Sequence, residues 1–313
     1  MNAMKVIRFN DSPDAPGLIP DTMPAPEPGE GELLIRVRAA GVTPPELRWY
    51  PTTHRPDGGR RLGAIPGHEF SGTVEGIGKG VDSRLLGRVV FGMNDWFGEG
   101  ATAEYCTARA EGVAFKPDGI GHCEAAAVPI GALTAWQGLY ERAGLRSGEN
   151  VLIHGGAGAV GVFAIQLAHR MGAKVATTAS GRHRDFLRTL GADAVIDYKT
   201  ERFEAIVREV DVVFDCVGGE TLKHSWDVLK PGGRMVTVAS DGEGSQDERT
   251  KAAFFIVEPK QAQLNEIAEL LERGELRVFV DSVVPMSQAS TAYLGTAPRL
   301  HGYGKVVIEI GEA

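Results

Sequence analysis

Residues 151–161, VLIHGGAGAVG, join a short apolar run to a glycine-rich turn. Within that turn Gly156, Gly158 and Gly161 give the spacing G-x-G-x-x-G. The next residues, VFAIQLAHRMGA (162–173), have the apolar spacing of a helix, and KVATTAS (174–180) predicts a second strand. A glycine-rich turn between a strand and a helix opens a βαβ unit of the kind that binds dinucleotides. This stretch therefore predicts a doubly wound α/β fold with a bound dinucleotide.

Each glycine of this turn has an expected role. Gly156 permits the tight turn, Gly158 lets a pyrophosphate approach the backbone, and Gly161 lets the helix pack closely on the strand. The free N–H groups of the turn and the positive end of the helix dipole would face the phosphates. We therefore expect Ala157 and Val160 to contact the dinucleotide as well.

The end of the second strand predicts which dinucleotide binds. Sites for NAD usually place Asp or Glu about 20 residues after the glycines, where it holds the ribose 2′-hydroxyl. Residues 176–184 read ATTASGRHR, which contains no carboxylate and two arginines. The planar guanidinium of Arg182, beside Ser180, is suited to a 2′-phosphate. The sequence therefore favours NADPH.

Composition and charge exclude several classes of protein. A length of 313 residues is typical of about two domains. The net charge of −8 argues against a nucleic-acid partner, and no apolar run reaches the roughly 18 residues of a membrane span. The amino terminus lacks the apolar core of a signal peptide. Three separated cysteines form neither a disulfide framework nor a metal motif, so we expect a cytoplasmic protein.

The composition and the order of strand-like and helix-like runs along the chain predict two domains, one of them discontinuous. About the first 120 residues are rich in Gly and Pro with short strand-like runs, which is typical of a compact β domain. Strands and helices then alternate, with a turn at Lys230–Gly233, as expected for a parallel sheet. The last strand-like runs resemble those of roughly the first 120 residues and do not alternate with helices. We expect a β-rich domain formed by 1–121 and 275–313, and a dinucleotide-binding domain at 122–274.

Segments from end to end of the chain carry a family resemblance. They include AAGVTPPELR (39–48), IPGHEFSGTVEGIG (65–78), VLIHGGAGAVGVFAIQLA (151–168), VDVVFDCVGGETL (210–222) and GYGKVVIEI (302–310). Together they resemble the zinc-independent quinone oxidoreductase branch of the medium-chain dehydrogenase/reductase superfamily. The resemblance implies a GroES-like catalytic domain, a Rossmann domain and a cleft between them. It also implies a homodimer that reduces quinones or α,β-unsaturated carbonyls with NADPH.

The positions of zinc ligands in relatives are mostly not retained. Zinc alcohol dehydrogenases of this superfamily carry cysteines where this chain has Thr43 and, approximately, Ile130. His68 and Glu69 remain, but two residues cannot supply the three protein ligands that a catalytic zinc takes. We therefore expect no metal and interpret His68 and Glu69 as a hydrogen-bonded pair in the cleft floor. His68 departs from the zinc-independent branch, so another metal or an acid role stays open.

The resemblance also implies contacts with cofactor and substrate. Thr43 would face the nicotinamide and orient its carboxamide or the substrate oxygen, which makes it the candidate catalytic residue. Cys216, Val217 and Ser240 follow strands, where open α/β sheets bind their ligands. The remaining cofactor contacts expected from the resemblance are Thr134, Tyr198, Phe255 and Lys305.

Aromatic residues give the candidate substrate slot. A flat apolar surface suits a planar quinone or enone. The aromatic residues expected to line it are Trp49, Tyr50, Trp96, Phe97 and Phe255. Two alternatives stay open at this point. One is an alcohol dehydrogenase that binds metal through His68, Glu69 and further ligands, and the other is a non-catalytic dinucleotide-binding protein with a crystallin-like or RNA-binding role.

Overall fold

The computed structural model describes residues 3–10 and 17–311, which form two compact units. The first unit contains the described residues up to Ile130 and those from Pro259 onward, and the second is Gly131–Glu258. These bounds differ from the predicted 121/122 and 274/275 boundaries. The difference arises because two helices that flank the second unit in the sequence, α2 (His122–Ala126) and α10 (Gln261–Glu272), pack on the sheet of the first unit.

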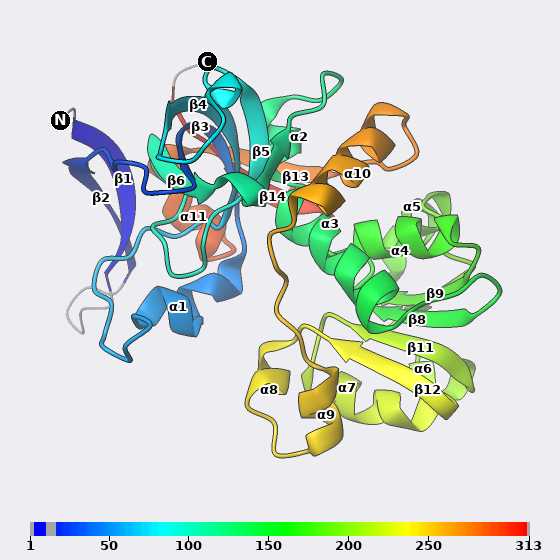
Figure 1. Ribbon diagram of the computed structural model, residues 1–313. Helices are drawn as coiled ribbons and strands as arrows, with labels where there is room; N and C mark the ends of the chain where they lie inside the picture. Colours follow the sequence, from blue (N-terminus) through cyan, green and yellow to red (C-terminus); the bar gives the residue numbers. More distant parts are fainter. Residues whose placement is uncertain (1–2, 11–16, 312–313) are drawn as a thin grey trace. The chain divides into compact units, whose positions relative to one another are not determined.

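The first unit is built on a seven-stranded sheet of order β13-β14-β3-β4-β5-β7, with β6 paired to β3 (Figure 1). Its pairs are antiparallel apart from β13 and β14, and β1 and β2 form a separate antiparallel ribbon. The strands are β1 (Ala3–Asn10), β2 (Gly17–Pro24), β3 (Glu32–Gly41), β4 (Glu69–Ile77), β5 (Val89–Met93), β6 (Tyr105–Arg109), β7 (Val113–Phe115), β13 (Val280–Pro285) and β14 (Lys305–Glu309). This architecture confirms the expected GroES-like domain.

The central strand β3 shows why this sheet forms. Its apolar residues alternate along the strand, and Leu33, Ile35 and Val37 point into the core with at most 2% exposure. Phe70 on β4 and Val90 on β5 are fully buried in the same core. Each such side chain contributes about 1.5–3 kcal/mol by leaving water. The alternation thereby fixes which face of β3 is buried and so its register.

Helices and helical turns complete the first unit. They are η1 (Pro44–Arg48), α1 (Tyr50–Thr53), η2 (Ser83–Leu85), η3 (Ala110–Gly112), α2 (His122–Ala126), α10 (Gln261–Glu272), η7 (Met286–Gln288) and α11 (Ala289–Tyr293). Helix α2 packs on β3 and β4, and α10 packs on β7. At the start of α10 the amide of Gln261 donates to the carbonyls of Ala110 (3.1 Å) and Val113 (2.9 Å).

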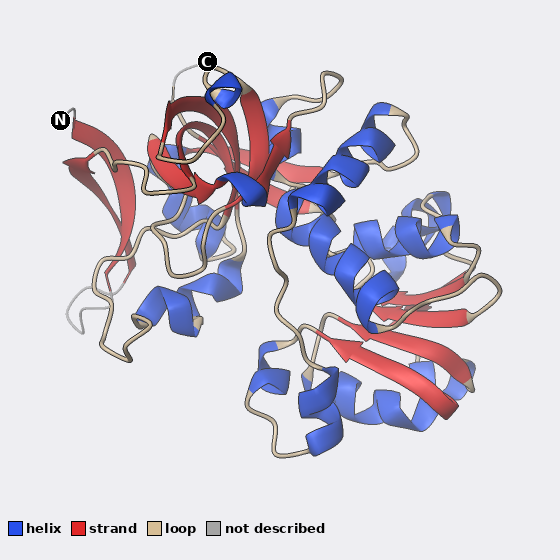
Figure 2. Cartoon of the chain, viewed as in Figure 1, coloured by secondary structure: helices blue, strands red, loops and turns tan. Residues whose placement is uncertain are grey.

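The second unit is a five-stranded parallel sheet of order β10-β9-β8-β11-β12, with helices on both faces (Figure 2). Its strands are β8 (Asn150–His154), β9 (Lys174–Ala179), β10 (Ala194–Asp197), β11 (Val210–Asp215) and β12 (Leu229–Thr237). Its helices and helical turns are α3 (Pro129–Trp136, which begins in the first unit), η4 (Gln137–Arg142), α4 (Gly161–Arg170), η5 (Gly181–His183), α5 (Arg184–Thr189), α6 (Phe203–Ile206), α7 (Gly219–Ser225), η6 (Trp226–Val228), α8 (Ser240–Glu243) and α9 (Glu248–Ala253). The doubly wound sheet is confirmed. Strand order reverses between β8 and β11, which is where such sheets bind ligands.

The residues Lys230–Gly233, expected to be a turn, are assigned to β12 but interrupt its pairing with β11. Leu229 pairs with Val210 and Arg234 with Val212, and Gly232 between them has a φ of +77°. Residues 124–144 are helical but do not form one helix, and they are divided among α2, α3 and η4. Proline has no N–H to donate and therefore begins a helix rather than continuing one, as Pro129 does for α3.

Candidate active site and dinucleotide site

Three adjacent strands of the first unit bring Lys305, Thr43 and Glu69 together, and we call these residues the Lys305 cluster. Val307 on β14 pairs with Gly41 on β3, so Lys305 lies across from Thr43. The Lys305 ammonium forms an ion pair with Glu69 and donates to the Thr43 hydroxyl oxygen at 2.9 Å. Lys305 is 4% exposed and Glu69 fully buried. Two predicted site residues thus meet, and the contact of each with a cofactor stays a prediction.

The carboxylate of Glu69 is held from two directions. Its Oε2 accepts a hydrogen bond from the backbone N–H of Ile130 at 2.9 Å, while Oε1 faces Lys305. Burial raises the pKa of Glu69, and the Lys305 charge and the Ile130 N–H oppose that rise. Gly41 provides the space, because a Cβ there would lie 2.5 Å from Glu69 Oε1. The missing side chain on β3 therefore lets lysine and glutamate meet across the strand.

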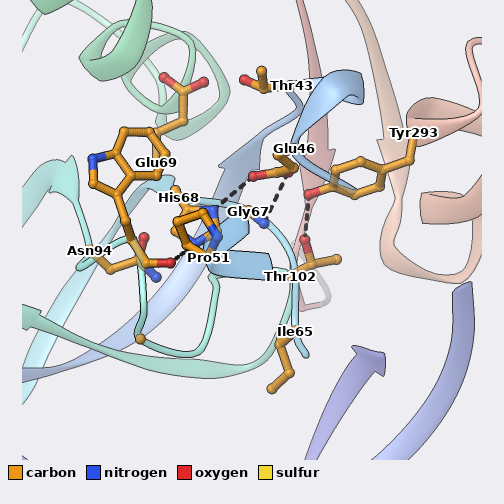
Figure 3. A network of polar contacts seen from close by, with 12 residues as sticks. Thr43, Glu46, Pro51, Ile65, Gly67, His68, Glu69, Asn94, Thr102 and Tyr293 are labelled. Carbon is orange, nitrogen blue, oxygen red and sulfur yellow. Dashed lines mark hydrogen bonds and ion pairs between the residues drawn. The ribbon is translucent and has the colours of Figure 1, made fainter. Parts of the chain in front are cut away.

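His68 belongs to a second buried group, shown in Figure 3. Its Nδ1 lies 2.8 Å from Glu46 Oε2, and its Nε2 lies 3.1 Å from the backbone carbonyl oxygen of Trp96. Glu46 Oε1 also accepts from the N–H of Gly67 at 3.1 Å. A carbonyl oxygen can only accept, so the contact with Trp96 gives Nε2 the donor role. Both ring nitrogens of His68 are therefore engaged inside the unit.

Tyr293 and Thr102 extend this group. The two hydroxyl oxygens lie 3.0 Å apart (Figure 3), and Tyr293 is buried on α11. Burial, together with the nearby Glu46, raises the pKa of the Tyr293 phenol well above its ordinary value. Sequence reasoning named neither Glu46 nor Tyr293. A signal for Glu46 existed, since it follows the AAGV segment at the third residue after Thr43.

The residues at the positions where the resemblance implies zinc ligands make other contacts. Thr43 presents a hydroxyl that accepts from Lys305, and Ile130 offers no side-chain donor atom. Glu69 faces an ammonium, and both nitrogens of His68 are bonded within the protein. Among the described residues, no three or more His, Cys, Asp or Glu side chains are grouped so that they could hold a metal ion.

Four of the five predicted slot aromatics gather in the first unit. The rings of Trp49 and Trp96 meet edge to face at 5.3 Å, and those of Tyr50 and Phe97 at 6.5 Å. Tyr50 and Phe97 are 48% and 39% exposed, so this surface is open to a ligand. The fifth, Phe255, lies in the second unit and is buried there against the Arg142 guanidinium at 5.5 Å.

In the second unit, the glycine-rich turn connects β8 to α4. A Cβ on Gly161 would lie 2.3 Å from the Gly155 carbonyl oxygen, which fits the expected close packing of helix on strand. A Cβ on Gly158 would meet only that same oxygen, at 3.2 Å, so its surface is open. The positive φ of +77° belongs to Gly155, whereas Gly156 leaves room for the Thr177 hydroxyl, 2.1 Å from its would-be Cβ. The tight-turn role thus falls to Gly155.

Helix α4 begins at this turn without a side-chain cap. The N-cap residue is Val160, whose side chain has no hydrogen-bonding atom. The N–H groups of Val162 and Phe163 already donate to the carbonyls of Gly158 and Val160, each at 3.1 Å, so a phosphate would meet the backbone N–H groups that precede them. The turn around Ala157 and Gly158 therefore suits the pyrophosphate of a dinucleotide.

His154, the last residue of β8, precedes the glycine-rich turn and contacts two buried hydroxyl groups. Its two ring nitrogens lie 2.9 Å from the hydroxyl oxygens of Thr178 and Ser225. The residue is fully buried, and burial lowers the pKa of His154 to about 4. This histidine was not named from the sequence, although it immediately precedes the glycines.

The buried His154 leads to a prediction about pH. The unfolded chain binds a proton near pH 6.5 and the folded chain only near pH 4, so stability is lost as pH falls through this window. The loss should be about 3 kcal/mol in the free energy of unfolding. Urea unfolding of the wild type and His154→Gln at several pH values measures it. The difference between the two proteins should change across this window, and parallel curves would contradict the assignment.

Asp215 organises the loop after β11. Its carboxylate accepts from the N–H groups of Val217 (3.0 Å) and Gly218 (3.1 Å) and from the Thr237 hydroxyl (2.8 Å). Burial raises the pKa of this carboxyl, and the three donors oppose that rise. The exposed Val217 is thereby placed beside Gly155, with 3.3 Å between its methyl group and the would-be Cβ of that glycine. Two loops at the reversal of strand order therefore lie side by side.

The remaining predicted cofactor residues are distributed over the same unit. Thr134 is buried on α3, Tyr198 is exposed after β10, and Ser240 is exposed at the start of α8. Cys216 is half-buried, and burial together with the neighbouring Asp215 raises the pKa of its thiol. Their contacts with a cofactor stay predictions.

The loop that follows β9 lies near a carboxylate that is not part of residues 176–184. A Cβ on Gly181 would lie 2.4 Å from the carboxylate of Asp197, at the end of β10. Arg184 pairs with Glu201 at 3.0 Å, whereas Arg182 contacts the imidazole of His183 at 3.0 Å. Contact of Arg182 with a cofactor stays a prediction.

Comparisons with known proteins agree with this architecture. Residues 29–131 match the family described as alcohol dehydrogenase GroES-like domain, and residues 190–308 match zinc-binding dehydrogenase. The chain is 32% identical to a probable zinc-binding mitochondrial oxidoreductase of Arthroderma benhamiae, covering 92% of this chain and 91% of that protein. It is 33% identical to a chloroplastic NADPH-dependent alkenal/one oxidoreductase of Arabidopsis thaliana, covering 90% and 73%. The quinone oxidoreductase of Coxiella burnetii superposes with a TM-score of 0.87 at 29% identity, covering 99% and 100%.

The chain belongs to the quinone oxidoreductase branch of the medium-chain dehydrogenase/reductase superfamily. The protein is therefore an oxidoreductase with a small-molecule substrate and a dinucleotide-binding fold. None of its described helices is both long and apolar enough to cross a bilayer.

Proposed function

We propose that this reductase transfers hydride from NADPH to a quinone or an α,β-unsaturated carbonyl, without zinc. One observation carries the proposal: where zinc members hold a metal, this chain has an ammonium buried between Glu69 and Thr43. A saturated ketone needs a strong electrophile to activate it. A conjugated acceptor needs less, because it spreads the developing negative charge over several atoms.

The residues fit both parts of this reaction, the binding of the cofactor and the binding of the acceptor. When bound, the nicotinamide supplies the hydride, and the open surface of Gly158 with the uncapped start of α4 suits its pyrophosphate. The Thr43 hydroxyl would donate a hydrogen bond to the oxygen on which charge develops. One face of the exposed Tyr50 ring stacks on His54, so a planar acceptor would stack on its other face, with the Phe97 ring nearly perpendicular beside it.

An activity assay tests the proposal. Purified protein should oxidise NADPH with a simple benzoquinone or an alkenal, and a saturated alcohol with NADP⁺ should give no signal. Related proteins are named as a quinone oxidoreductase and an alkenal/one oxidoreductase, which supports this choice of acceptors. Binding of NADPH without turnover of any acceptor would favour a non-catalytic dinucleotide-binding protein.

Metal content gives a separate prediction. The protein should purify with much less than one zinc per chain, and chelation should leave both turnover and Tm unchanged. The physical reason is that His68 and Glu69 are bonded within the protein and two ligand positions are Thr43 and Ile130. Elemental analysis and a chelator titration measure both quantities. One tightly bound zinc per chain, lost together with activity, would support a metal-dependent alcohol dehydrogenase instead.

Cofactor preference rests on Ser180 and Arg182, which we propose hold the 2′-phosphate. A hydrogen bond to a charged group contributes about 1.5–3 kcal/mol, so Arg182→Ala should weaken NADPH binding roughly 10- to 150-fold. NADH binding should change little, since it lacks the phosphate. Titration of both cofactors into the wild type and the variant measures this. Arg188→Ala, on the exposed side of α5, is the matched control.

Two outcomes would contradict that assignment. An equal loss for both cofactors would place Arg182 against a group that they share. A wild type that prefers NADH would show that the Asp197 carboxylate beside Gly181, rather than Arg182, governs this corner.

We also propose, on the family resemblance alone, a homodimer formed through the cofactor-binding unit in the cytoplasm. Light scattering at micromolar concentration tests the assembly, and a monomeric mass would contradict it. Two of the relatives compared above are named as mitochondrial and chloroplastic, so the compartment needs its own test by cell fractionation.

A further inference from the structure

The hydrogen bonds of the Lys305 cluster have a fixed direction. The Ile130 N–H donates to Glu69 at 2.9 Å, and Lys305 donates both to Glu69 and, at 2.9 Å, to the Thr43 oxygen. An ammonium has only protons to give, and a carboxylate can only accept from it. The Thr43 oxygen is therefore an acceptor toward Lys305.

This direction decides what the Thr43 hydroxyl can do next. A hydroxyl has one proton and two lone pairs, and the lone pair facing Lys305 is occupied. Its proton is left to point elsewhere. Thr43 stands before η1 without capping it, so this turn makes no demand on the hydroxyl. Thr43 is also only half-buried, whereas Lys305 and Glu69 behind it are buried.

We propose that Lys305 is a positioning residue that holds Thr43 as a hydrogen-bond donor toward the oxygen of the acceptor carbonyl. This inference rests on the proposed reductase function. Hydride leaves NADPH for the conjugated carbon, the electron pair moves to the carbonyl oxygen, and Thr43 stabilises that oxygen while keeping its own proton. Water supplies the proton that completes the reduction. The buried ammonium also strengthens the donor, because its charge polarises the O–H bond.

Without Lys305, the hydroxyl could turn and accept instead of donate. The Lys305 charge would thus stabilise negative charge on the substrate oxygen through the Thr43 hydroxyl, whereas a bound cation would contact that oxygen directly. Lys305 is buried behind Thr43, so we assign it no contact with the substrate. Its effect on rate must therefore pass through the threonine.

A mutant cycle on the full-length protein tests this dependence. The measured quantity is the single-turnover rate of NADPH oxidation by a benzoquinone, with NADPH affinity and Tm followed in parallel. Thr43→Val should lower the rate by about 100- to 1,000-fold, as loss of one oxyanion donor does, and Thr43→Ser should stay near wild type. Lys305→Met with Glu69→Gln removes the ion pair as a unit and leaves an oxygen for the Ile130 N–H. Lys305→Arg keeps the cation.

The decisive comparison is the effect of K305M/E69Q on the rate with Thr43 present and with Thr43 replaced by valine. K305M/E69Q should lower the rate about tenfold when Thr43 is present and by no more than about twofold in the T43V background. Lys305→Arg should retain most of the rate. An equal loss in both backgrounds, or no loss in either, overturns the proposal, since a merely structural lysine would act independently of the hydroxyl. A wild type with no NADPH turnover of any quinone or enone would instead overturn the proposed function, and this inference with it.

Discussion

Lys305→Met should lower the free energy of unfolding by about 3–5 kcal/mol, because it leaves the carboxylate of Glu69 buried without its partner. Chemical denaturation measures the loss. The double variant K305M/E69Q should recover most of it, since neither buried charge then remains. A single variant as stable as the wild type would show that Glu69 is not held by Lys305.

The cost of this single variant should also depend on pH. Burial already raises the pKa of Glu69, and removing Lys305 takes away the main opposing charge. A raised folded-state pKa means that the folded form is favoured where the carboxyl is protonated and loses stability as pH rises. The destabilisation should therefore be larger at pH 8 than at pH 5. K305M/E69Q has no such carboxyl, so the same comparison should show no pH trend from this site.

Gly161→Ala should damage both the fold of the second unit and its cofactor affinity. The new methyl group would lie 2.3 Å from the Gly155 carbonyl oxygen and 2.6 Å from the Gly156 Cα. Both are backbone atoms of the turn, so the clash cannot be relieved by rotating a side chain. We expect a loss at the upper end of the about 1–3 kcal/mol typical of overpacking. Thermal unfolding and NADPH titration measure the two effects.

Gly158→Ala separates binding from folding. A Cβ there meets only the Gly155 oxygen at 3.2 Å, so Tm should change little. The methyl group would nevertheless occupy the surface that we propose the pyrophosphate approaches, so NADPH affinity should fall by about tenfold or more, the effect of about 1.4 kcal/mol. Gly244→Ala, in open space in the same unit, is the control. Unchanged NADPH affinity in Gly158→Ala would place the pyrophosphate elsewhere.

The sequence alone determined the fold and its order along the chain. Alternating apolar residues in β3, the apolar run of β8 and the glycines after it are local patterns, and local patterns specify strands, helices and the turns between them. The strand-like runs at the end of the chain likewise predicted that the chain would return to its first unit. The boundary helices were assigned differently because packing, as at Gln261 on Ala110 and Val113, decides which unit a helix joins.

Only the tertiary structure decided which side chains work together. Thr43 and Lys305 were each named from the sequence, but they are 262 residues apart, and their contact depends on the register of β14 against β3. Glu69 reaches the same lysine because Gly41 has no side chain between them. In the same way, Asp197 enters the corner beside Gly181 from a neighbouring strand. Periodicity and motif spacing describe neighbours along the chain, whereas hydrogen bonds and ion pairs form between neighbours in space.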